Sequence, residues 1–124
     1  MDVTNEFEAS YTENAHRLEI TIQPTERSSI VVEQSKLTCG QTVVWLGDVV
    51  DSIREIPGVE SAYPRGDTIY FTVAKKNHDV FSRILDNVFA VIGTALDDAT
   101  DRTSARLEEL SKYTVLRDDS QHER

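Results

Sequence analysis

The segment from residue 48 to residue 96 constrains the fold most, because its residue pattern changes in an ordered way along a short length. Apolar residues first recur at the spacing of one helix face, and Pro57 with Gly58 then ends that helix. Two stretches rich in β-branched and aromatic residues follow around a turn, and a wide apolar stripe then predicts a longer helix. The predicted elements are a helix over 46–56, strands over 59–63 and 68–73 with a turn at 64–67, and a helix over 80–96. We expect the two strands to form an antiparallel hairpin.

The region before this segment predicts further strands. Residues 17–22 alternate apolar and polar side chains, and residues 29–33 contain consecutive β-branched residues. These two strands are able to pair with each other as a hairpin. Residues 34–41 are ambiguous, with a loop around Cys39-Gly40 as one interpretation, and residues 42–45 suit either a short strand or the first turn of the following helix.

These patterns predict a single α+β domain over residues 16–116. We expect an antiparallel sheet of about four strands with two main helices packed on one face, plus a C-terminal helical extension in which 113–116 could add a strand. Residues 1–15 are expected to be a flexible N-terminal segment, and residues 117–124 a disordered charged tail. The expected core consists of Leu18, Ile20, Ile30, Val32, Val50, Ile53, Val59, Ile69, Phe71, Ile84, Leu85, Val88 and Ile92.

Composition and charge exclude several classes of function. The formal net charge is −9, which is unfavourable for direct nucleic-acid binding, because that requires clustered Lys and Arg. No apolar run is long enough to span a membrane, and the acidic first residues do not resemble a signal peptide. The single Cys39 excludes an internal disulfide, so we expect a cytoplasmic protein.

No residues form a recognisable catalytic, cofactor or metal constellation. Cys39 has no second cysteine at metal-ligand spacing, and a small, partly buried role is expected for it. The three histidines are far apart, and the paired carboxylates are expected to lie on solvated faces of so acidic a chain. We therefore predict no enzyme activity, no catalytic residues, no cofactor and no metal site.

Three aromatic residues are the candidates for partner binding. Trp45 is either a core anchor or an exposed contact, and Tyr63 and Tyr70 lie on the predicted hairpin. The wide apolar stripe of 80–96 is expected to pack within the chain, although a partner protein, including a second copy, could also cover it.

The chain resembles the N-terminal domain of Nfu/NifU-like iron–sulfur cluster assembly proteins over residues 20–96. The resemblance rests on the helix end Ile-Arg-Glu-Ile-Pro-Gly-Val at 53–59 and on the strand with its lysine at 66–75. Gln23-Pro24-Thr25 stands where the opening of that family would be, but Glu26-Arg27 replaces the Asn-Pro of the family. The Cys-x-x-Cys domain that usually follows is also missing, so the resemblance implies a stand-alone domain that holds no cluster by itself.

The resemblance implies a non-catalytic protein-interaction module, an adaptor in iron–sulfur cluster assembly or delivery. Two alternatives remain open. One is a small dimerising accessory subunit of a larger complex, similar to the small subunit of the KEOPS tRNA-modifying complex. The other is a small-ligand regulatory domain of ferredoxin-like shape, similar to ACT domains.

Overall fold

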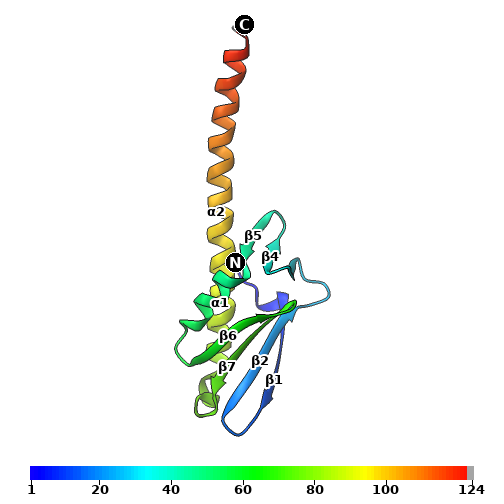
Figure 1. Cartoon of the computed structure of the whole chain (residues 1–124), viewed down its shortest axis with the longest axis vertical. Helices are drawn as coiled ribbons and strands as arrows, with labels where there is room; N and C mark the ends of the chain where they lie inside the picture. The colour runs from blue at the N-terminus through cyan, green and yellow to red at the C-terminus, as the bar shows by residue number, and fades with distance from the viewer. Residues whose placement is uncertain (123–124) are drawn as a thin grey trace.

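The computed structural model describes the backbone of residues 1–122 and the side chains of residues 1–102. Figure 1 shows a small domain of strands and helices from which the last helix projects. The elements in chain order are η1 (Thr4–Glu6), β1 (Phe7–Glu13), β2 (Arg17–Pro24), β3 (Ile30–Glu33), β4 (Lys36–Cys39), β5 (Thr42–Trp45), α1 (Leu46–Arg54), β6 (Val59–Arg65), β7 (Thr68–Ala74), η2 (Lys75–Val80) and α2 (Phe81–His122).

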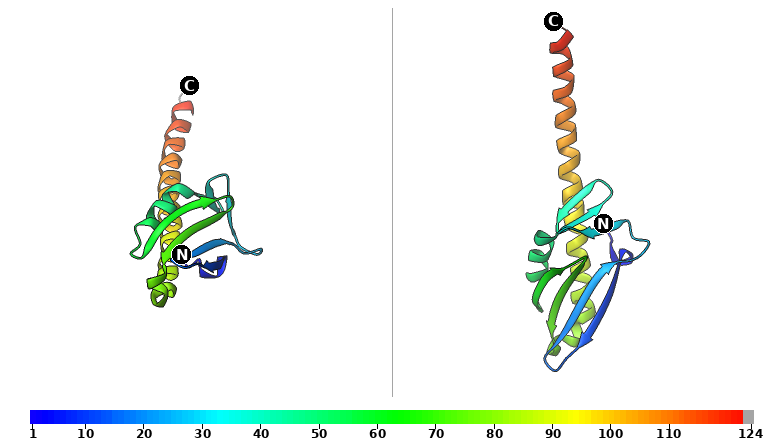
Figure 2. Two further views of the ribbon diagram at one scale, coloured as in Figure 1. Left: turned by 60° about the horizontal axis from the view of Figure 1, so that its bottom comes forward. Right: turned by 45° about the vertical axis from the view of Figure 1, so that its right-hand side comes forward.

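The larger sheet is four-stranded and antiparallel, in the order β1-β2-β7-β6. Both helices lie on the same side of it, as the two views of Figure 2 show. The predicted α+β class, the four-stranded antiparallel sheet and the long C-terminal helix are therefore confirmed. The predicted hairpin is also present, as β6 and β7, although Pro64 and Arg65 belong to β6 rather than to the turn.

The predicted core is buried, with Val59 and Leu85 only partly so. One face of β7, carrying Ile69, Phe71 and Val73, packs beneath the helices as its alternation predicts. The other face of β7 is more enclosed than expected, because Tyr70 and Thr72 are also buried. A hydrogen bond of 2.6 Å between the hydroxyls of Ser61 and Thr72 satisfies the buried threonine.

A second, three-stranded sheet in the order β3-β4-β5 was not expected. Residues 34–41 were ambiguous in sequence, with a loop as one interpretation, and β3 was expected to be able to pair with β2. Instead, Gln34 and Ser35 both take positive φ, 51° and 64°, and form the two-residue connection of a β3–β4 hairpin. Glycine or asparagine usually marks such a turn, so Gln-Ser gave little indication of it.

Residues 1–15 were predicted to be a flexible segment, but the structure shows ordered elements there. Residues 7–13 form the edge strand β1, which pairs with β2 along its whole length. Only Phe7 of this strand is buried, where its ring lies 6.1 Å from that of Phe89 on α2. Phe7, Ala9 and Tyr11 alternate with polar residues, a strand pattern that the prediction of a flexible segment overlooked, and the Tyr11 ring lies 5.6 Å from that of Phe81 on α2.

At the other end, the backbone of α2 remains helical through His122. This differs from the predicted charged tail at 117–124 and from the possible strand at 113–116, while residues 123 and 124 lie outside the described part of the chain. The helix has 42 residues, about 63 Å at 1.5 Å per residue. Figure 1 shows that its C-terminal part extends beyond both sheets.

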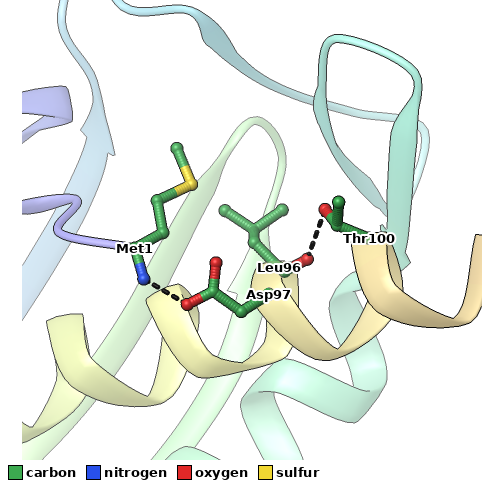
Figure 3. A network of polar contacts seen from close by, with 4 residues as sticks. All are labelled: Met1, Leu96, Asp97 and Thr100. Carbon is green, nitrogen blue, oxygen red and sulfur yellow. Dashed lines mark hydrogen bonds and ion pairs between the residues drawn. The ribbon is translucent and has the colours of Figure 1, made fainter. Parts of the chain in front are cut away.

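Two polar contacts attach other elements to α2. Figure 3 shows the N-terminal amine of Met1 paired with the carboxylate of Asp97. The Thr100 hydroxyl donates to the carbonyl of Leu96 at 2.8 Å and lies 2.9 Å from the Thr42 hydroxyl on β5. These contacts therefore attach the N-terminus and the small sheet to the long helix.

Candidate partner-binding surfaces

The small sheet has one covered face and one open face. Ile30, Val32 and Leu37 pack into the core from the covered face. Because successive side chains of a strand point to opposite faces, the residues between them point outward. We call this open surface the outer face of the small sheet; its members are Val31, Glu33, Lys36, Thr38, Val43 and Trp45.

The outer face exposes three large apolar side chains. Val31, Val43 and Trp45 are 47%, 51% and 59% exposed, and the register aligns Val31 and Val43 across Thr38 of the central strand. The ammonium of Lys36 lies 5.3 Å from the centre of the Trp45 ring, a cation–π arrangement. Isolated apolar side chains are normal on protein surfaces, but a group on one rigid face is typical of an interaction surface.

A second aromatic group lies on the larger sheet, on the face away from the helices. The rings of Tyr63 and Tyr70 are 4.7 Å apart, and the Arg65 guanidinium lies 4.1 Å from the centre of the Tyr70 ring. Arg65 donates to the Tyr63 hydroxyl at 2.8 Å, and the Tyr70 hydroxyl donates to Glu19 at 3.0 Å. Burial and the bond to Glu19 both raise the pKa of Tyr70 above its ordinary value near 10.

This tyrosine group makes its hydrogen bonds within itself. A shallow hollow of about 220 Å³ beside it is lined by Ser10, Tyr11, Thr12, Thr21 and the three side chains Glu19, Arg65 and Tyr70. Tyr63 and Tyr70 both have hydrogen-bond partners in the protein, whereas the exposed Arg65 uses one of its five N–H donors in the bond to Tyr63.

The three candidate residues from the sequence are therefore not one site. Tyr63 and Tyr70 are cross-strand neighbours on the larger sheet, whereas Trp45 lies on the small sheet. Trp45 is exposed, which corrects the reading of it as a core anchor.

A groove between α1 and α2 is a feature that the sequence reasoning missed. Its volume is about 670 Å³, and apolar side chains from α1, from the turn that follows it and from α2 line it, including Val49, Ile56 and Val91. The only sequence signal was the unusual width of the apolar stripe at 80–96, since one edge of that stripe faces the groove rather than the sheet.

The chemically reactive side chains are dispersed. Cys39 is partly buried, 4.0 Å from the Ser29 hydroxyl, while His16 and His78 are exposed at separate connections. Within residues 1–102, no three His, Cys, Asp or Glu side chains are grouped so that they could hold a metal ion. His122 falls outside the described side chains.

Comparison of the chain with protein-family models, with curated proteins and with solved structures found no match. No helix in the described part of the chain combines the length and the apolar character needed to cross a membrane.

Proposed function

We propose that this protein is a non-catalytic interaction module that docks on a protein partner through the outer face of the small sheet. The observation that carries the proposal is the exposure of Val31, Val43 and Trp45 on a face whose reverse side is anchored in the core. Rigid support matters, because a preformed surface loses less conformational entropy when it binds.

Trp45 is the expected centre of this contact. Tryptophan is enriched among the few residues that dominate binding energy, and truncating such a residue typically costs at least about 2 kcal/mol. That value corresponds to a rise of about thirtyfold in the dissociation constant. Trp45 stands at the N-cap position of α1 without a side-chain capping bond, so its indole does not stabilise the helix end.

The resemblance to Nfu-type N-terminal domains supplies the first partners to test. It suggests iron–sulfur assembly proteins and the apoproteins that receive clusters, with this chain as an adaptor between them. The small sheet is the surface that this adaptor would present.

The test compares the normal protein with Trp45→Ala in quantitative affinity purification from native cells. Val80→Ala is the matched control, since Val80 is also exposed, at 38%, but lies in η2 and outside the small sheet. We expect a partner in stoichiometric amount that is lost with Trp45→Ala and retained with Val80→Ala, while circular dichroism shows both variants folded. Partners that are captured equally by all three proteins would contradict the proposal, and iron–sulfur proteins among the lost partners would support the adaptor role.

A second candidate function is a dimerising accessory subunit, and the length of α2 favours it. The C-terminal part of this helix extends past both sheets (Figure 1), where it lacks the tertiary packing that supplies most of the stability of helices in proteins. Pairing with another helix would stabilise it. Light scattering of the pure protein beside a chain that ends at Arg102 tests this idea. A dimer that becomes a monomer on shortening supports it, and a full-length monomer at micromolar concentration contradicts it.

A further inference from the structure

The groove between α1 and α2 exists because of how α1 is held. The buried side of α1, including Val50 and Ile53, packs mainly against β6 and the sheet, so the two helices meet only along part of their length. Between them remain apolar walls and small side chains, namely Val44, Val49, Ile56, Pro57, Ala90, Val91 and Ala95.

The rim of the groove is acidic. Asp48 and Glu55 border it on the α1 side and Asp98 borders it on the α2 side, and all three are exposed. Among the described side chains, none of these three carboxylates forms an ion pair, and Arg102 is the only cationic residue lining the groove. A ligand with basic side chains beside an apolar strip therefore matches this surface in charge and in polarity.

The walls determine which backbone conformation the ligand needs. Both long walls are helices whose backbone groups are already bonded internally, and the outer strand β5 contributes only Val44 to the lining, so an extended peptide would find little strand edge to pair with. The small side chains of Ala90 and Ala95 instead allow the close approach of another helix, for which axis separations of about 8–10 Å are usual. A helix laid in this groove would rest its apolar side on Val91 and Ala95, which are partly exposed.

The length of the groove sets the size of the ligand. Its lining residues on α2 run from Asn87 to Arg102, which spans about 22 Å at 1.5 Å per residue. This distance matches a helix of about four turns, or about 15 residues.

We propose that the α1–α2 groove binds a basic amphipathic helix of about 15 residues from a partner protein. This site is separate from the outer face of the small sheet, because neither Trp45 nor Val43 lines the groove. The protein would then engage two protein segments at once, one on each surface.

The test uses a defined probe, a fluorescein-labelled peptide of about 15 residues made of Leu, Ala and Lys with leucines on one helix face. Fluorescence anisotropy with the full chain measures its dissociation constant. We expect binding that is weakened at least about tenfold by Ala90→Trp, which fills the groove from an exposed position, and by the pair Asp48→Lys and Glu55→Lys.

The matched control reverses two exposed carboxylates elsewhere, Glu26→Lys and Glu60→Lys, and so changes the net charge equally. We expect this control to bind the peptide within about threefold of the normal protein, since only long-range attraction is lost. An equal loss in the control pair would overturn the proposal, as would unchanged binding to Ala90→Trp. Trp45→Ala should bind the peptide normally, so that failure of the groove and failure of the small-sheet surface are distinguished.

Discussion

Replacing Gly58 with alanine tests how the connection between α1 and β6 is built. Gly58 has a φ of +99°, a conformation that side chains rarely adopt. An added Cβ would also lie 2.7 Å from Cδ1 of Ile84, a buried residue of α2. Glycine at this position therefore serves two purposes: it permits the backbone turn, and it lets α2 pack against the turn.

The two effects have separable magnitudes. Placing a side chain in a left-handed conformation costs about 1–2 kcal/mol. The overlap with Ile84 adds about 1 kcal/mol, at the low end for overpacking, because the clashing methyl is the end of a flexible side chain. The free energy of unfolding should therefore fall by about 2–3 kcal/mol, which lowers the melting temperature by about 8–15 °C for a chain of this size.

Gly66→Ala is the control, because Gly66 also has positive φ, +61°, but an added Cβ there meets nothing within 4 Å. Urea unfolding followed by circular dichroism measures both variants. Gly66→Ala should show only the conformational part, about 1 kcal/mol. If the two variants lose equal stability, the contact with Ile84 is unimportant; if Gly58→Ala loses none, the reasoning about this turn is wrong.

Three further predictions concern other parts of the domain. Gly47→Ala should raise the free energy of unfolding in urea by about 0.5–1 kcal/mol, because nothing within 4 Å obstructs a Cβ at this position of α1 and alanine favours helix. An unchanged free energy of unfolding would contradict this. Gly93→Ala would place a Cβ against the Met1 carbonyl oxygen, so hydrogen exchange in the first residues should accelerate about tenfold, and unchanged exchange would show that the N-terminus does not pack there. Because the pKa of Tyr70 is raised, the folded state holds the phenol proton more tightly than the unfolded state does. The stabilising contribution of Tyr70 is therefore complete below pH about 10 and declines as the pH rises through the folded-state pKa. Absorbance titration against Tyr70→Phe checks this, and removal of the hydrogen-bonded carboxylate with Glu19→Gln should lower the pKa toward its ordinary value.

The candidate surfaces were only partly predictable. An exposed tryptophan and a buried one look alike in sequence, and the alternation of 42–45 does not say which face of a short strand the core covers. The position of Trp45 became clear only with the register of the small sheet, which places it beside Lys36 on the side opposite Leu37 and Val44.

The sequence by itself determined the part of the fold that depends on local signals. Helical spacing, the Pro57-Gly58 stop and the β-branched runs are properties of neighbouring residues, and they specified α1, the β6–β7 hairpin and the start of the long helix closely. The core was predicted for the same reason, since period and burial are linked in each element.

The tertiary structure decided what neighbouring residues do not encode. Strand β1 is held by backbone pairing and by Phe7 against Phe89, which is distant in sequence, so the short alternation of Phe7, Ala9 and Tyr11 did not by itself distinguish a paired edge strand from a flexible segment. The burial of Tyr70 results from its neighbours on other strands. The groove depends on the separation of α1 and α2, which is set by how each helix packs on the rest of the domain. The side-chain pattern within one helix does not determine that separation.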